Sequence, residues 1–230
     1  DLRRQGGWHD RAGDRAPRSA RRGIAQQPDD RAERRIGAAD RACALLLALS
    51  AMQPSAAVAE QLVLTPVKDN TIYSNALNGS NAVGNIFVGL NDAGSVRRGL
   101  LAFDLSALPP GATIDAVSLQ MGVDNSRPGV FAVTAHRLGM DWGEGTSTGS
   151  GGAGGQPGLA TNGDATWRYT FFSTSTWSTN GGDFAAAVSA SANAGANGTV
   201  TWSGAGLVAD VQAWVDSPAS SFGWILIGAE

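Results

Sequence analysis

The segment at residues 142–155, WGEGTSTGSGGAGG, contains two short patterns that are associated with chemistry. Residues 149–154 match G-x-G-x-x-G, the pattern of a dinucleotide site, and residues 145–149 match G-x-S-x-G, the pattern of a hydrolase nucleophile. A dinucleotide site needs a strand before the glycines and a helix after them, whereas QPG follows here. A hydrolase of this kind places its histidine after the serine, but His136 precedes Ser147. We therefore predict that neither pattern is functional.

His136 is the only histidine after residue 59, and it lies in an alternating run at residues 130–138. It shares one side of that run with Val130, Ala132 and Thr134. This position favours a structural histidine over a catalytic base. Because Cys43 is the only cysteine, the sequence also lacks the nitrogen and sulfur ligands that a zinc site usually needs.

Carboxylates lie at both ends of a long, glycine-rich and flexible loop that is predicted at about residues 143–164. Asp141 and Glu144 flank one end, and Asp164 and Asp183 lie at or beyond the other. Hard oxygen ligands suit calcium, so these four residues are the predicted candidates for a calcium site. Solvated turn carboxylates are the alternative, since the sequence has no D-x-D-x-D-G loop. Asp141 with Glu144 is also the one close pair that could supply the acid and base of a polysaccharide lyase or glycosidase.

Aromatic side chains flank the same loop and suggest a second kind of chemistry. Flat rings with polar groups beside them suit the faces of sugars, and the candidates for such a carbohydrate site are Trp142, Trp167, Tyr169 and Trp177. The alternative is that each ring fills the core, because a sandwich without disulfides needs large apolar side chains. Three other tryptophans are predicted to be core residues: Trp202, Trp214 and Trp224.

The elements that must position these residues are mostly strands. Nine short segments rich in branched and aromatic residues are separated by glycine, proline and asparagine: 61–67, 70–74, 84–90, 97–108, 112–123, 129–138, 166–172, 198–204 and 223–228. In the fifth segment Val117, Leu119, Met121 and Val123 alternate onto one face, which predicts one face against the core. This spacing indicates an all-β sandwich or barrel.

One short helix is predicted near the C-terminus. Asp210 can cap its first amides, and Val211, Trp214 and Val215 recur at helical spacing before Ser217 and a proline end it. An edge strand is the alternative for this segment.

Charge and composition divide the chain near residue 59. Residues 1–59 contain 11 of the 17 basic residues, and the remainder has 6 basic against 13 acidic ones. An acidic body lacks the basic surface that binds phosphate backbones, so nucleic acid is excluded as its expected partner.

The apolar run at 42–52 follows an arginine and precedes AVA at 57–59. This arrangement predicts a signal peptide over 36–59, cleaved before Glu60, rather than a membrane span. Residues 1–35 are expected to be disordered or to lie upstream of the natural start.

The run at 97–119, RRGLLAFDLSALPPGATIDAVSL, resembles the DNRLRE-type secreted β-sandwich modules, which are also grouped with carbohydrate-binding module family 96. Further matching pieces occur in order: GNIFVG, AHRLGMDWGEG, GDATW, ADVQAWVDSP and GWILIG. The resemblance implies a jelly-roll-like antiparallel module of 60–230 that is secreted by bacteria and attached to larger surface proteins or polysaccharide-degrading enzymes. Such modules usually have another strand after the position of Gly228, so this module is expected to be truncated and part of a longer chain.

The expected function is therefore a non-catalytic extracellular module that binds polysaccharide or a cell-surface component. The alternative is a structural or adhesive spacer without a specific sugar ligand. Contiguous exposed tryptophans would favour binding, and buried rings would favour the spacer.

Overall fold

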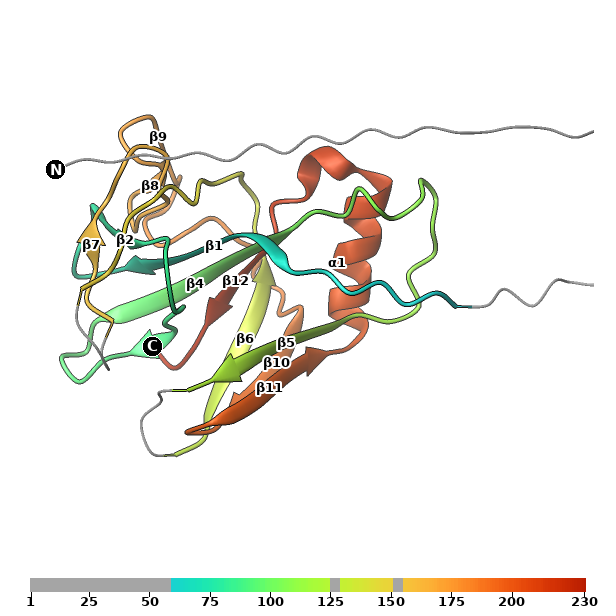
Figure 1. Cartoon of the computed structure of the whole chain (residues 1–230), viewed down its shortest axis with the longest axis horizontal. Helices are drawn as coiled ribbons and strands as arrows, with labels where there is room; N and C mark the ends of the chain where they lie inside the picture. Colours follow the sequence, from blue (N-terminus) through green and yellow to red (C-terminus); the bar gives the residue numbers. More distant parts are fainter. Residues whose placement is uncertain (1–58, 125–128, 151–154) are drawn as a thin grey trace, which may run out of the picture. The chain divides into compact units, whose positions relative to one another are not determined.

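The computed structural model describes residues 59–124, 129–150 and 155–230 (Figure 1). The predicted upstream segment and nearly all of the predicted signal peptide lie outside these residues. Two glycines of the dinucleotide-like pattern, Gly151 and Gly154, also lie outside them.

Strands dominate the described residues, and every pair of named strands is antiparallel. The all-β class, the antiparallel sandwich and the short α-helix near the C-terminus are thereby confirmed. The elements in chain order are β1 (Pro66–Tyr73), β2 (Gly79–Asn81), β3 (Gly89–Leu90), β4 (Val96–Phe103), β5 (Ser118–Val123), β6 (Phe131–Arg137), β7 (Gly158–Leu159), β8 (Tyr169–Phe171), β9 (Ser175–Thr176), β10 (Ala190–Ala194), β11 (Gly198–Ser203), α1 (Ala205–Asp216), the 3-10 turn η1 (Pro218–Ser220) and β12 (Trp224–Ile227).

A large sheet organises the fold. Seven of its eight strands follow the order β10-β6-β12-β4-β1-β2-β7, and β3 pairs with β4 beside this path. The last strand, β12, is inserted between β4 and β6, where Ile225 pairs with Leu100 on one side and with His136 on the other. Two smaller sheets, β11-β5 and β8-β9, complete the strand pairing of the described residues.

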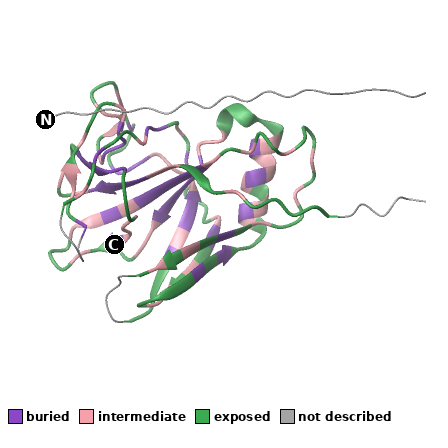
Figure 2. Ribbon diagram, viewed as in Figure 1, coloured by how far each residue is buried: buried purple, intermediate pink, exposed green. Residues whose placement is uncertain are grey.

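The large sheet is covered on both faces, because neighbouring residues of its central strands point to opposite sides. Leu101 and Leu226 belong to a core shared with β5, β11 and α1. Leu100 and Ile225 belong to a second core, which is filled by residues from the segment 138–184. Figure 2 shows the buried residues concentrated on these central strands and along one side of α1. The described residues of the segment 138–184 therefore act as a second cover layer.

β5 follows the predicted alternation. Leu119 is buried and packs in the first core with Val117, Met121 and Val123, while Ser118, Gln120 and Gly122 are exposed. The strand pairs in regular register with β11 from Ser118 opposite Ser203 to Val123 opposite Gly198. The sequence pattern thus identified the correct inward face.

The N-cap of α1 lies six residues earlier than predicted, at Gly204 and not at Asp210. It buries Leu207, Val211 and Trp214, whose spacing of four and three residues puts them on one side of the helix. Asp210 lies inside the helix and does not cap it, because its carboxylate accepts a hydrogen bond from Trp224 Nε1 at 2.8 Å. The residue before the helix is Gly204, which offers no side-chain cap.

Several predicted strands differ in extent from the observed ones. The segments 61–67 and 70–74 are replaced by the single strand β1, which begins at Pro66, a residue without a backbone N–H for the ladder. In the segment 84–90 only Gly89 and Leu90 pair as a strand. The residues before them contact the sheet through side chains and not through strand pairing. Ile86 and Val88 lie over Gly99 of β4, where a Cβ would be 2.5 Å from Ile86.

No helix in the described part of the chain is both long and apolar enough to cross a bilayer.

Candidate functional site

The predicted long loop is tied to the edge of the large sheet over its described residues. The backbone N–H of Ala82 donates to the carbonyl of Ser147 at 2.9 Å, and that of Gly149 donates to Asn81 Oδ1 at 2.6 Å. Farther along, β7 pairs with β2. Ser147 is 2% exposed, so the serine of the nucleophile-like pattern lies inside the fold, where a substrate does not reach it.

His136 is a structural residue, as predicted. It is 7% exposed, and its ring contacts Phe184 edge to face at 5.3 Å. Nδ1 lies 2.9 Å from the carbonyl oxygen of Ala185, and Nε2 lies 3.1 Å from the Thr134 hydroxyl. Because both ring nitrogens have partners, the histidine holds the segment after residue 184 against β6.

The prediction of a sugar-binding role is wrong for two of the four rings, because both are buried. Trp142 has no exposed surface, and its Nε1 donates to the carbonyl of Phe222 at 2.9 Å. Trp177 is 4% exposed, and its Nε1 donates to the carbonyl of Thr166 at 2.9 Å. Both rings fill the second core, so neither can stack on a glycan in this fold. Trp202, Trp214 and Trp224 are buried as predicted.

The other two rings keep part of their surface. Trp167 is half-buried, and the Arg98 guanidinium lies 4.9 Å from the centre of its ring. Tyr169 is also half-buried: Arg168 lies 5.5 Å from its ring centre, and Phe172 contacts it edge to face. We call Trp167, Arg168, Tyr169 and Phe172 the ring surface. It comprises the start of the β8–β9 hairpin, its turn and the two residues before it.

The turn of this hairpin holds an unusual backbone conformation. Ser173 has a φ of 61°, which a residue with a Cβ seldom adopts. It directly follows Phe172, so the tight turn positions that ring against Tyr169. The Tyr169 hydroxyl donates no hydrogen bond to a described residue, which leaves it free to meet a ligand.

The predicted calcium ligands do not form a metal site. Asp141 pairs with Lys68 at 2.7 Å, and Asp183 accepts the backbone N–H groups of Ser178 and Thr179. Asp164, fully buried, accepts hydrogen bonds from the backbone and hydroxyl of Thr161. Across the described ranges, no three acidic, histidine or cysteine residues are placed to hold one ion. These carboxylates instead stabilise turns and the loop.

Glu144, the fourth of them, lies close to Asp69 of β1. Burial is the main cause that raises the pKa of Glu144 above its ordinary 4.5, and the negative charge of Asp69 adds to the rise. The Asp69 backbone amide and the Lys68 charge oppose it. Burial also raises the pKa of Asp69. No local sequence pattern pairs these two carboxylates, because 75 residues separate them.

The raised pKa of Glu144 predicts a pH effect on stability. Above 4.5 the folded chain holds this proton more tightly than the unfolded chain, so stability falls as pH rises through the raised pKa. Glu144→Gln should therefore show a smaller loss of unfolding free energy than the wild type between about pH 4.5 and 7. Urea denaturation at several pH values measures this, with Glu60→Gln as the exposed control. An equal slope in wild type and Glu144→Gln would contradict the assignment.

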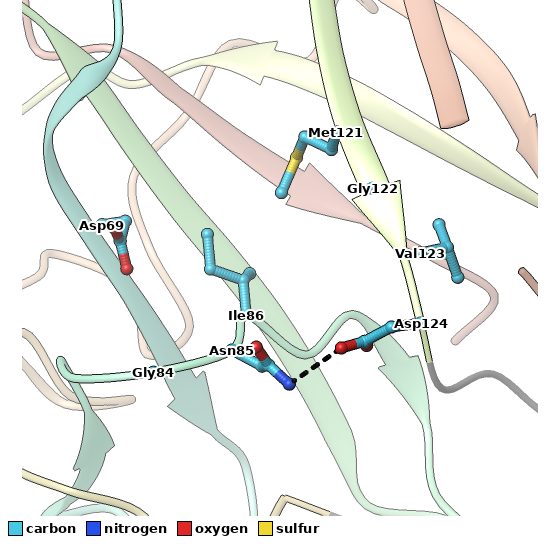
Figure 3. Close-up of a pocket in the computed structure, with 8 residues that line it drawn as sticks. All are labelled: Asp69, Gly84, Asn85, Ile86, Met121, Gly122, Val123 and Asp124. Atoms are coloured by element: carbon cyan, nitrogen blue, oxygen red, sulfur yellow. Dashed lines mark hydrogen bonds between the residues drawn. The ribbon is translucent and has the colours of Figure 1, made fainter. Parts of the chain in front are cut away.

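A cleft of about 330 Å³ lies where the two sheet layers separate, and sequence analysis did not find it. It is lined by Asp69, Gly84, Asn85, Ile86, Met121, Gly122, Val123 and Asp124. Figure 3 shows that these residues come from β1, from the segment before β3 and from the end of β5. Asn85 Nδ2 donates to Asp124 Oδ2 at 3.5 Å, while Asp69 lies opposite them across Ile86 and Met121. One signal in the sequence was overlooked: Asp69 is a charged residue within a strand.

Comparisons of the chain with family models, with curated proteins and with solved structures find no match. The family resemblance of residues 97–119 therefore stays a prediction.

Proposed function

We propose that this chain is a non-catalytic module that acts outside the cell and binds polysaccharide. The observation that carries the proposal is the ring surface, where Trp167 and Tyr169 each keep exposed surface and each have a guanidinium packed against the ring. A ring held in this way is already ordered before a sugar arrives, which reduces the entropy lost on binding. Arg168 is exposed and forms no ion pair with a described residue, so it is available to a carboxylate or sulfate on the glycan.

A non-catalytic role agrees with the state of the nominated acid and base. The Asp141 carboxylate accepts hydrogen bonds from Lys68 and from its neighbour's backbone amide, and Glu144 lies beside the backbone amide and the carboxylate of Asp69 in β1. Neither arrangement leaves the two carboxylates facing each other across a cleft lined by both, which is what hydrolysis of a glycosidic bond requires.

Retention on immobilised glycans tests the proposal. We expect the wild type to be retained by at least one of cellulose, xylan, alginate and polygalacturonate, and Trp167→Ala and Tyr169→Ala to weaken that retention about tenfold each. Phe131→Ala is the matched control, because Phe131 is an aromatic residue of β6 that is 37% exposed and lies outside the ring surface. Arg168→Gln should weaken retention on the two acidic glycans more than on the neutral ones, because it removes a charge as well as a ring contact. Failure of the wild type on every glycan would contradict sugar binding.

Secretion is the second part of the proposal and has its own test. Export from a bacterial host should yield a product that begins at Glu60, because the small residues at 57–59 suit a signal peptidase. Mass spectrometry of the exported protein measures its N-terminus. A folded external product that still carries residues 1–59 would contradict the assignment.

A structural spacer is the second candidate, and the burial of Trp142 and Trp177 favours it. Because large rings fill the second core, the sheet is covered on both faces. Such a sheet suits a module that bears load or holds neighbouring domains apart. The retention experiment distinguishes the two functions, since a spacer is retained by none of the glycans.

A further inference from the structure

The two layers of the sandwich differ in width. The large sheet has eight strands, whereas the layer facing its first core contains only β5 and β11 together with α1. β5 pairs with β11 alone, and no backbone hydrogen bond between described residues involves the other edge of β5. Alternate N–H and C=O groups of an edge strand point outward, so this edge presents unpaired donors and acceptors.

Burial within the layer falls from β11 to β5 and along β5 toward its C-terminal end. On β11, Val200 and Trp202 are 4% and 3% exposed, and Leu119 on β5 is 7% exposed. Met121 and Val123, farther along β5, are only half-buried although their side chains face the same core. Apolar side chains on an inward face stay partly exposed when the next strand of their layer is missing.

The strand β5 itself lacks three of the usual protections against edge pairing. Its sequence, SLQMGV, contains no proline and no charged residue, and its register with β11 has no bulge. A Cβ on Gly122 would meet no atom within 4 Å, so the outward face of the strand is uncovered at this position. The cleft of about 330 Å³ lies at this place.

The cleft also contains a charge that lacks a partner. The Asp69 carboxylate is half-buried and forms no hydrogen bond or ion pair with a described residue. Asp124 and Asn85 add a second carboxylate and an amide to the opposite wall. A cationic side chain placed between the layers would satisfy Asp69, and apolar neighbours on either side of it would contact Ile86 and Met121.

We propose that the free edge of β5 binds an extended peptide segment of a partner protein, which adds a third strand to the β11-β5 sheet. The partner strand alternates, with apolar side chains and one lysine or arginine facing inward toward Asp69. Its backbone pairs with β5, and its outward residues are polar. No residue of the ring surface lines the cleft, so this inference is independent of sugar binding.

The peptide TVTKTVT, acetylated and amidated, is the probe, because its lysine and two valines lie on one face of a strand. Calorimetry with the full chain should show one binding site, and amide hydrogen exchange should slow at alternate residues of β5. Asp69→Asn should weaken binding about tenfold, which corresponds to loss of one charge pair. Asp216→Asn, a matched change at the end of α1, should leave the affinity unchanged. TVTETVT, and TVTKTVT with N-methylated alternate amides, should not bind.

Several results would overturn the proposal. These are absence of binding at millimolar peptide, equal affinity for wild type and Asp69→Asn, or protection of β10 amides instead of β5 amides. Protection of β5 without peptide, in step with dimer formation in sedimentation, would show that a second copy of the chain occupies the edge. Circular dichroism of Asp69→Asn shows that this variant is folded before its affinity is compared.

Discussion

Replacing Trp142 by alanine is expected to lower the free energy of unfolding by about 3–5 kcal/mol. The ring is fully buried in the second core, and its Nε1 donates to the Phe222 carbonyl at 2.9 Å. Lys68 Nζ lies 4.9 Å from the ring centre and donates to the Trp142 carbonyl, so the change also loosens a link between β1 and the segment 138–184. The loss combines a large cavity with an unpaired carbonyl oxygen.

Urea denaturation of Trp142→Ala measures this loss, and two further variants give it a scale. Trp142→Phe keeps most of the apolar contact but removes the hydrogen bond, so it should cost less than half as much. Leu159→Ala, at a residue that is 91% exposed, should change stability by less than about 0.5 kcal/mol. A Trp142→Ala variant as stable as Leu159→Ala would place the ring at the surface after all.

Gly223→Ala is expected to destabilise the fold by about 3–5 kcal/mol through strain and overpacking. Gly223 has a φ of 82°, and a Cβ there would lie 1.9 Å from the carbonyl oxygen of Leu101. Its own carbonyl accepts the N–H of Leu138 at 2.9 Å. This glycine therefore lets β12 enter the sheet beside β4 while the start of the cover segment 138–184 is held to it.

Gly111→Ala separates strain from overpacking. Gly111 has a similar φ of 75°, but a Cβ there would meet nothing within 4 Å. Gly111→Ala should lower the free energy of unfolding only by the cost of a left-handed backbone conformation, about 1–2 kcal/mol. Thermal or urea unfolding of both variants gives the difference. Equal losses would mean that the close contact with Leu101 relaxes without cost.

Sequence patterns predicted the strands that pack through their own apolar side chains. β5 was predicted with its inward face because Leu119 and Met121 alternate with polar residues. β2, with the sequence GSN, gave no signal although all three of its residues are buried. Ser80 donates to Asn70 Oδ1 at 2.8 Å, and the Asn81 backbone donates to the same oxygen, so polar bonding replaces apolar burial in this strand.

β10 was missed for a different reason. Its sequence is ASANA, and α1 packs close to the residue before it: a Cβ on Gly206 would clash with the carbonyl of Ser189. A strand of alanine, serine and asparagine has little β-propensity, and its pairing with β6 defines it. Tertiary packing determines whether such a segment forms a strand, and no local sequence pattern shows that packing.

The candidate site was predicted only in part, because residues 143–164 were predicted to form a flexible loop, whereas the segment 138–184 that contains them packs on the sheet. Glycine, serine and threonine dominate it, yet its few large residues fill the second core. A signal for this was present in β12, whose run WILI is apolar without alternation. Such a run indicates burial on both faces of a sheet, which requires a second cover layer. Applied to Trp142 and Trp177, that argument would have placed both rings inside.

The position of β12 also sets the order in which the molecule can form. Strands β4 and β6 both pair with residues 224–227, so a chain emerging from a ribosome has a gap in the middle of its main sheet until those residues appear. Contacts between segments so far apart in sequence form slowly. The main sheet of the nascent chain therefore stays incomplete, with the facing edges of β4 and β6 unpaired, until β12 has been made.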